Sequence, residues 1–377
     1  MRIRELDGLR GIAVLAVINR HYLAWYPRAG SAYGWLGVDL FFVLSGFLIT
    51  SILLGLRKKE HYFKIFYARR ALRIFPPYFL ALIVYLALSF GMGRPGTWGL
   101  WLQYVFYYTS LFVGPPSQLR SVSPVVPLVV AGGLSVFWSL SVEEIYYTIW
   151  APVVRFTNQA AFAGILVGMI VVAPLLRGYF HTPLFPEVYT FYCRMDGLAY
   201  GSVVALLIAQ RNLAPERWLG VDKAIDWLTV TLLPLTALFW VVEGGNAANI
   251  LVSTIGITAA DLSFAVVVHC LVRRSGGNQF WVRCFRIKWL RSVGMVSYSL
   301  YLFHYPLLLV SEEFIAHFHL SRHVAVVCQV LLGLLLSFAV AYGLWYALES
   351  RILHWKDRKV PSPAHPGVNQ YASASVR

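Results

Sequence analysis

The chain has 377 residues, of which 58% are hydrophobic and only 13% are charged, and aromatic side chains make up 16%. This composition is typical of a polytopic membrane protein and leaves no stretch for a large soluble domain. The net charge of +15 needs no nucleic-acid partner, because basic loops in contact with anionic membrane lipids account for most of it. The four cysteines are scattered and have neither the spacing of a metal site nor that of a disulfide framework.

Hydropathy predicts an all-α, polytopic fold with about ten transmembrane helices. The first apolar segment follows a charged N-terminal stretch and lacks a small-residue cleavage site, which favours a retained helix over a signal peptide. The spans are expected at residues 9–27, 34–56, 75–93, 134–156, 159–176, 191–210, 226–243, 249–272, 293–313 and 323–348.

The loops between these spans differ in charge. Most of the 32 lysine and arginine residues fall on one side, and the positive-inside rule therefore predicts that both termini are cytoplasmic. Residues 97–115 are apolar enough for an eleventh span, but that span would move the basic residues of 273–291 outside. We therefore expect residues 94–133 to form an outer interfacial or re-entrant segment. A membrane domain over residues 1–350 and a basic, disordered cytoplasmic tail over residues 351–377 complete the prediction.

Arg10 and His21 lie eleven residues apart in the first predicted helix. Eleven steps of about 100° return nearly to the starting angle, so both side chains are expected on one face, about 16 Å apart along the axis. Because an ionisable group at the bilayer centre costs roughly 2.5–3.5 kcal/mol, two on one face indicate a lined pathway or site. The alternative is an arginine that snorkels to the inner boundary and a histidine that is packed in the bundle.

A basic stretch precedes the third span. Helical spacing places Arg70 and Arg73 on neighbouring turns of one face, with Arg69 beside them, and two prolines end or kink this helix. Such a fork of guanidinium groups suits a phosphate, so these arginines are candidate ligands of a phosphate-bearing molecule. The alternative is a solvated collar of positive charge. A second basic stretch, residues 283–291, is assigned to lipid headgroups.

Few acidic residues lie within the predicted spans. Asp39 is near the outer end of the second span. Farther along the same span, Ser45 and Gly46 are small enough to let another helix or a ligand chain come close. Glu143 and Glu144 are adjacent in a later span. Since adjacent helix positions are about 100° apart, we expect one of these two carboxylates to face the site and the other to have a structural partner.

Two further polar positions have structural interpretations. Arg194 and Asp196 are expected to neutralise each other near the outer end of a span. His304 has tyrosine and serine neighbours that can satisfy its nitrogens, so we expect a packed, hydrogen-bonded histidine there.

Six ordered motifs resemble those of the membrane-bound acyltransferase family 3, over roughly residues 5 to 350. They are LDGLRG with His21, GVDLFFVLSGFLIT, FYARRALRIFPPYF, FWSLSVEEIYY, RMDGLAYG and VSYSLYLFHYPL. The resemblance implies an enzyme of the bacterial plasma (inner) membrane that takes an acyl group, usually acetyl from cytoplasmic acetyl-CoA, and places it on a hydroxyl. It implies as acceptor a surface polysaccharide, a lipid-linked sugar or a glycosylated small molecule. The chain departs from the family in the polar pair before His21 and in the absence of a proline after Glu349.

The resemblance and the residue chemistry together predict a donor site and a base, without a metal. The phosphates of acyl-CoA would bind Arg70 and Arg73 with Arg10 and the adjacent Arg69, and the pantetheine arm would pass Arg10 and Ser45. His21 would take the proton of the acceptor hydroxyl, while Asp39, Glu143 or Glu144 would orient its imidazole. Direct transfer and a covalent acyl-enzyme both stay open. So does the oxyanion donor, whose candidates are Ser45, Ser139, Tyr146 and Tyr301.

A transporter or flippase and an inactive binding scaffold of the same fold are the alternative functions. Polar groups in ten spans also describe a substrate path, but the sequence shows no clear inverted repeat or paired broken helices. Retention of Arg10, His21, Arg70 and Arg73 favours an enzyme over a scaffold. The identity of the acceptor is not predicted.

Overall fold

Helices account for all regular structure in the residues that the computed structural model describes, which are 3–23, 31–112, 126–182, 186–246 and 248–360. No strand occurs in these ranges, which confirms the predicted all-α class. Seven of their helices are long and apolar enough to cross a membrane, or eight if one bent pair counts as a span. The chain is therefore a multi-pass membrane protein, whereas the predicted number of about ten spans is not confirmed.

Each predicted span overlaps a helix or a broken helix. The more polar helices α1 (Arg4–Tyr22) and α10 (Met195–Leu213) are not among the seven apolar ones. The bent pair is α14 (Lys288–Met295) and α15 (Ser297–Ala316), whose axes differ by 74°. The remaining helices are α2 (Leu36–Leu56), α3 (Tyr62–Gly91), α7 (Leu128–Ser135) with α8 (Trp138–Phe156), α9 (Gln159–Tyr179), α11 (Leu219–Val242), α12 (Ile257–Arg273) after a π turn at Val252–Gly256, and α16 (Arg322–Leu344).

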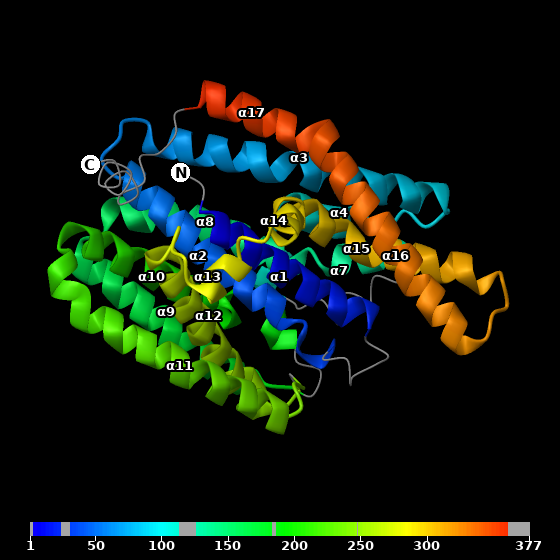
Figure 1. The fold of residues 1–377 in the computed structure, drawn as a ribbon. Helices are drawn as coiled ribbons and strands as arrows, with labels where there is room; N and C mark the ends of the chain where they lie inside the picture. The colour runs from blue at the N-terminus through cyan, green and yellow to red at the C-terminus, as the bar shows by residue number, and fades with distance from the viewer. Residues whose placement is uncertain (1–2, 24–30, 113–125, 183–185, 247, 361–377) are drawn as a thin grey trace.

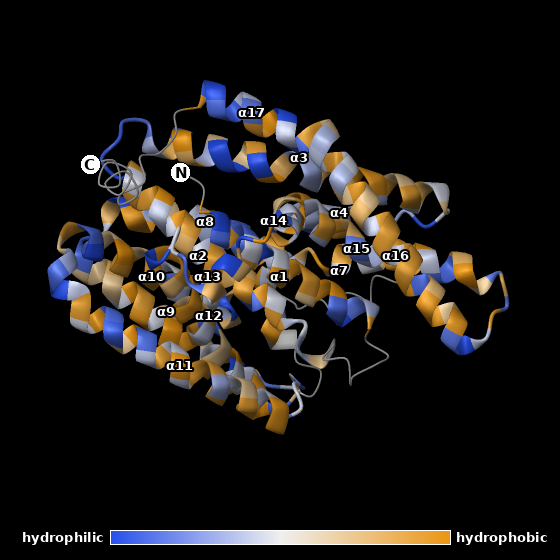
Figure 2. Cartoon of the chain, in the orientation of Figure 1, coloured by the Kyte–Doolittle hydropathy of each residue, from blue (hydrophilic) through white to orange (hydrophobic). Residues whose placement is uncertain are grey.

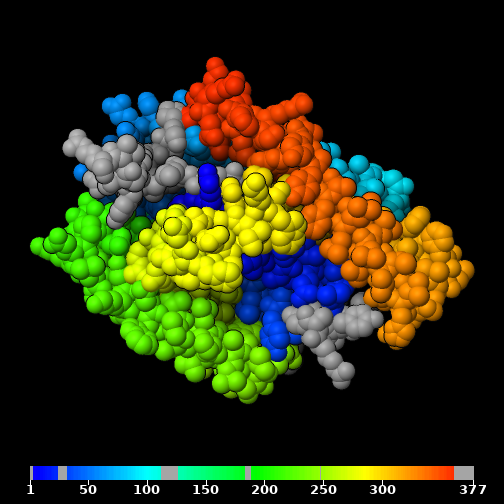
Figure 3. Space-filling model, viewed as in Figure 1, coloured from blue at the N-terminus to red at the C-terminus, as the bar shows by residue number. Residues whose placement is uncertain are grey.

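Helix α1, which is more polar than the seven apolar spans, lies in the middle of the molecule, where it packs against α2, α12, α14 and α15 (Figure 1). Helices α9 and α11 flank the bundle at one side and α16 at the other, each contains many hydrophobic residues (Figure 2), and many of their large apolar side chains are exposed. The yellow segment that contains α13 (Phe280–Cys284) and α14 covers part of the dark blue α1 (Figure 3). The fold thus surrounds polar side chains with apolar helices that suit contact with lipid.

Helices α2 and α10 approach closely at two glycines. A Cβ atom on Gly46 would lie 2.0 Å from the carbonyl oxygen of Leu198, and one on Gly201 would lie 2.0 Å from that of Val43. Only glycine fits such a backbone contact. The prediction that Gly46 lets another helix come close is therefore confirmed.

The predicted outer segment contains short helices rather than an eleventh span. Helix α4 (Trp98–Val105) and helix α5 (Thr109–Phe112) are separated by a break in which Tyr107 has a positive φ of 56°. Neither is long enough to cross a bilayer. The position of this segment at the outer interface stays a prediction, and residues 113–125 lie outside the described part of the chain.

The C-terminal part of the last helix continues farther than predicted. Helix α16 passes through a π turn at Trp345–Glu349 into α17 (Ser350–Lys359), which lies beside α3 (Figure 1). Disorder was expected from residue 351, and this expectation is wrong for residues 351–359, because no proline follows Glu349 to stop the helix. The rest of the predicted tail, residues 361–377, is outside the described residues.

Candidate functional site

A cavity of about 780 Å³ lies among the helices around α1. This volume is within the range of small-molecule sites. Its described lining contains both basic and acidic side chains together with an apolar part that includes Phe41 and Leu140. The basic members are Arg10, Arg70, Arg73, Arg211, Arg273 and Lys356, and the acidic members are Asp7, Glu143, Glu144, Glu349 and Asp357.

The structure brings three of the four predicted phosphate ligands to this cavity. Arg10 of α1 and both Arg70 and Arg73 of α3 line it. The Nε atom of Arg70 is buried and has no hydrogen-bond partner in the described chain, which leaves a donor available to a ligand. Arg69 is not among the lining residues, since it forms an ion pair of 2.7 Å with Asp357 of α17.

Both adjacent glutamates of α8 line the cavity, so the expectation that only one of them faces it is wrong. The cavity spans enough of the helix circumference to reach both positions. Glu143 also has structural partners: Ser45 donates to its Oε1 at 2.7 Å and Tyr147 donates to its Oε2 at 2.6 Å. Ser45 itself lines the cavity, where the sequence predicts a residue beside the ligand. Its hydrogen bond also holds the carboxylate of Glu143 in place.

His21 is not among the cavity-lining residues and forms a pair with His304 instead. Nδ1 of His21 lies 2.9 Å from Nε2 of His304 and 3.1 Å from the carbonyl oxygen of Val17. The ring of Tyr305 stacks on His21 with a centroid distance of 4.7 Å. His304 is fully buried, whereas His21 remains partly exposed.

The imidazole of His304 has a second partner. Its Nδ1 lies 2.8 Å from the carbonyl oxygen of Tyr301. The backbone carbonyl oxygen of His304 accepts a hydrogen bond of 2.9 Å from the hydroxyl of Tyr22. The same hydroxyl lies 2.8 Å from Ser337 Oγ. The prediction of a packed, hydrogen-bonded His304 is confirmed. Its pairing with His21 was missed, because no local signal links residues 283 positions apart.

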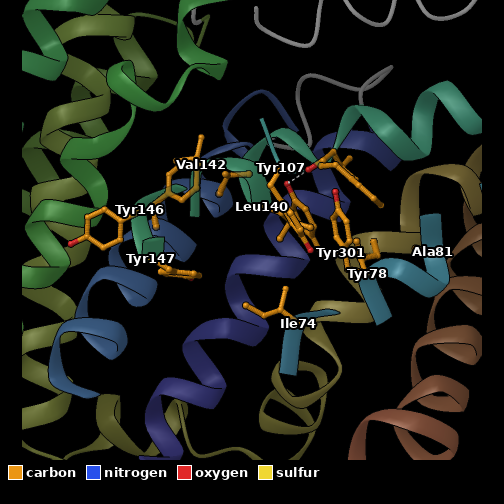
Figure 4. Close-up of a cluster of buried hydrophobic side chains, with 14 of the residues drawn as sticks. Ile74, Tyr78, Ala81, Tyr107, Leu140, Val142, Tyr146, Tyr147 and Tyr301 are labelled. Atoms are coloured by element: carbon orange, nitrogen blue, oxygen red, sulfur yellow. Dashed lines mark hydrogen bonds between the residues drawn. The ribbon is translucent and has the colours of Figure 1, made fainter. Parts of the chain in front are cut away.

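Aromatic rings connect the cavity to this histidine pair. Phe41, which lines the cavity, contacts Tyr301 edge to face at a centroid distance of 6.2 Å. Tyr301 lies 5.9 Å from the ring of His304 and its hydroxyl lies 2.6 Å from Ser139 Oγ. Figure 4 shows Tyr301 near Tyr78 and Tyr107, with Tyr146 and Tyr147 on the other side of Leu140.

The predicted neutralisation of Arg194 by Asp196 is wrong. Arg194 forms its ion pair with Asp39 of α2. The carboxylate of Asp196 accepts hydrogen bonds of 3.0 and 2.7 Å from the two terminal nitrogens of Arg177. All four side chains are buried. Each aspartate thus meets an arginine from a different segment, and a buried carboxylate requires such a partner.

Asp39 is therefore engaged with Arg194 rather than with the imidazole of His21. Within the described residues, the hydrogen bonds of the His21 ring go to Val17 and His304, and none goes to Asp39, Glu143 or Glu144. The expectation of an orienting carboxylate is not met, because a second imidazole occupies that position.

The chain is similar to a known protein family and to several curated proteins. A family model described as an acyltransferase domain matches residues 3–346. The chain is 26% identical to YrhL of Bacillus subtilis strain 168 over 82% of its length and 49% of the relative. It is 25% identical to the peptidoglycan O-acetyltransferase OatA of Listeria monocytogenes, over 81% of the chain and 49% of the relative. It is also 25% identical to the O-acetyltransferase OatA of Staphylococcus aureus, over 88% of the chain and 55% of the relative.

The chain spans about half the length of these curated relatives. No solved structure matches the chain significantly.

Proposed function

Because the chain belongs to acyltransferase family 3, we propose that it is an integral membrane O-acetyltransferase that moves an acetyl group from acetyl-CoA to a hydroxyl of a carbohydrate. The names of its relatives support a glycan such as peptidoglycan as the acceptor. The observation that carries the proposal is the cavity, which extends from the arginines of α1 and α3 to Phe41. Phe41 contacts the ring of Tyr301, which in turn lies beside the histidine pair.

The basic side of the cavity is the proposed site for the phosphates of acetyl-CoA. Arg10, Arg70 and Arg73 offer planar donors suited to phosphate oxygens, and the Nε donor of Arg70 has no described partner. The pantetheine arm would pass Ser45 and direct the thioester toward Phe41. Under the positive-inside topology, this basic side faces the cytoplasm, which supplies acetyl-CoA.

The partly exposed His21 is the proposed general base. The acceptor hydroxyl gives its proton to the imidazole while its oxygen attacks the thioester carbon. The carbon–sulfur bond breaks, and the departing thiolate of CoA takes the proton back from the imidazolium. The products are the acetyl ester and CoA with a free thiol. Since His21 lies near the end of α1 opposite Arg10, donor and acceptor can approach from opposite sides.

Ser139 and Tyr301 are the favoured oxyanion donors among the four candidates. Tyr301 contacts both Phe41 and His304, and its hydroxyl lies 2.6 Å from that of Ser139. In the resting protein both hydroxyls also donate to the carbonyl oxygen of Val136, at 3.1 Å from Tyr301 and 3.3 Å from Ser139, so a hydroxyl that serves the oxyanion must turn away from this carbonyl. The hydroxyl of Tyr146 instead lies 2.6 Å from Ser202 Oγ, and Ser45 donates to Glu143.

Release of CoA from acetyl-CoA by the nanodisc-embedded protein, with soluble peptidoglycan fragments as acceptor, tests the proposal. His21→Ala should lower turnover by about 10²-fold or more, whereas His317→Ala, which changes an exposed histidine, should not. Arg70→Ala should weaken acetyl-CoA binding, measured by calorimetry, relative to Lys64→Ala on the same helix. Absence of acetyl-CoA binding to the wild type would overturn the donor assignment and favour a transporter or scaffold. Unchanged turnover in His21→Ala would remove the proposed base.

A further inference from the structure

We propose that His304 is the positioning residue of the active site and holds His21 in the tautomer that presents an unprotonated Nε2 to the acceptor. This inference rests on the proposed function, in which His21 is the base. It assigns to a second imidazole the role that a carboxylate has in many hydrolases.

The carbonyl group of Tyr301 determines where His304 carries its proton. A carbonyl oxygen only accepts hydrogen bonds, so the 2.8 Å contact requires a hydrogen on Nδ1 of His304. His304 is fully buried, and among the described residues no carboxylate hydrogen-bonds to it, so the neutral ring is favoured. A neutral imidazole with a hydrogen on Nδ1 has a lone pair on Nε2. Nε2 of His304 is therefore an acceptor.

The proton position on His21 follows from two independent contacts. Nε2 of His304, as an acceptor 2.9 Å away, requires a hydrogen on Nδ1 of His21. The carbonyl oxygen of Val17, 3.1 Å from the same Nδ1, requires it as well. Neutral His21 then has its lone pair on Nε2, the nitrogen left for an acceptor hydroxyl.

The surroundings of the pair limit its rotation. Tyr305 stacks on the ring of His21, and the fully buried ring of His304 is held through its Nδ1 by the carbonyl oxygen of Tyr301. Because both rings are restrained, the proton position is built into the resting protein. Such preorganisation lowers the cost of reaching the transition state.

Two substitutions at position 304 separate positioning from packing. A glutamine can place its Oε1 near the site of Nε2 and still accept from His21, whereas an asparagine is too short to do so. His304→Asn should lower kcat by about 10²-fold while changing the KM for acetyl-CoA less than about twofold, and His304→Gln should recover at least about tenfold of that loss. Equal losses in the two variants, or a loss confined to KM, would contradict the proposal.

A spectroscopic readout does not depend on turnover. Nitrogen-15 NMR of the full chain in nanodiscs, with the His21 signals assigned by their absence in His21→Ala, should show Nδ1 protonated in the wild type. His304→Asn should shift His21 toward the Nε2-protonated form. Protonated Nε2 in the wild type would overturn the proposal. If His21→Ala abolishes turnover and His304→Asn leaves it unchanged, the positioning role fails while the proposed function stands; if His21→Ala remains active, the proposed base itself fails.

Discussion

The guanidinium carbon of Arg70 lies 4.1 Å from the ring centroid of Tyr147, and the hydroxyl of Tyr147 donates to Glu143. One aromatic ring thus joins a cation on α3 to a carboxylate on α8 at the cavity wall. Arg70 packs on the ring itself, whereas Glu143 accepts from the ring's hydroxyl. Under the proposed function, we therefore expect Glu143 to act in donor binding rather than in proton transfer.

Removal of the Tyr147 ring should weaken the donor site. Tyr147→Leu should raise the Kd for acetyl-CoA roughly 2- to 30-fold, because an arginine–aromatic contact contributes about 0.5–2 kcal/mol. Tyr147→Phe keeps the ring and should retain most of the affinity. Calorimetric titration of both variants in nanodiscs checks the prediction, and equal weakening in the two would assign the effect to the hydroxyl instead.

Phe41 should limit the length of the acyl group. It lines the cavity and backs onto Tyr301, so Phe41→Ala should lengthen the apolar end toward the histidine pair. We expect the ratio of kcat/KM for butyryl-CoA over acetyl-CoA to rise at least about tenfold, since each added methylene buried is worth about 0.8 kcal/mol. Phe47→Ala, which also changes a lining phenylalanine, is the matched control. The prediction fails if the two variants change the ratio equally.

The buried pair of Asp39 and Arg194 should be structural. Asp39→Ala or Arg194→Ala alone should lower the free energy of unfolding by about 3–5 kcal/mol, because each leaves an uncompensated buried charge. The double variant should lose less than the sum of the two. Thermal unfolding in detergent measures all three, with Asp357→Ala as a control that breaks a more exposed pair, worth about 0–1 kcal/mol. Additive losses would show that the pair is not coupled.

Gly46 should not tolerate a side chain. Gly46→Ala places a Cβ 2.0 Å from the Leu198 carbonyl oxygen, so we expect a loss of about 1–3 kcal/mol and a lower Tm. Gly168→Ala on α9 meets nothing within 4 Å and should leave Tm unchanged or raise it, because alanine favours a helix by about 1 kcal/mol over glycine. A Tm of Gly46→Ala equal to that of Gly168→Ala would mean that α2 and α10 can separate without cost.

The sequence predicts features that depend on one helix at a time. Hydropathy locates the helices, and 3.6-residue spacing puts Arg70 and Arg73 on one cavity. The spacing also places Arg69 beside these two residues. It does not reveal that the side chain of Arg69 forms an ion pair with Asp357 of α17. Spacing along a helix defines a face, not the element that meets this face.

Contacts between distant segments are therefore where sequence reasoning fails. Arg194 has Asp196 as its nearest acid along the chain, yet the packing of α2 on α10 supplies Asp39 instead. Similarly, His304 meets His21 only because α15 packs against α1. A carboxylate was the natural expectation for the partner of a base, and only the packing identifies an imidazole.

Helix α17 also shows which part of the chain is needed to build the cavity. Leu353, Lys356 and Asp357 of this helix line the cavity, although the match to the family ends at residue 346. One wall of the proposed donor site therefore comes from sequence outside the shared domain. Relatives that differ after this point can differ in how they admit and retain the donor, even where their six motifs agree.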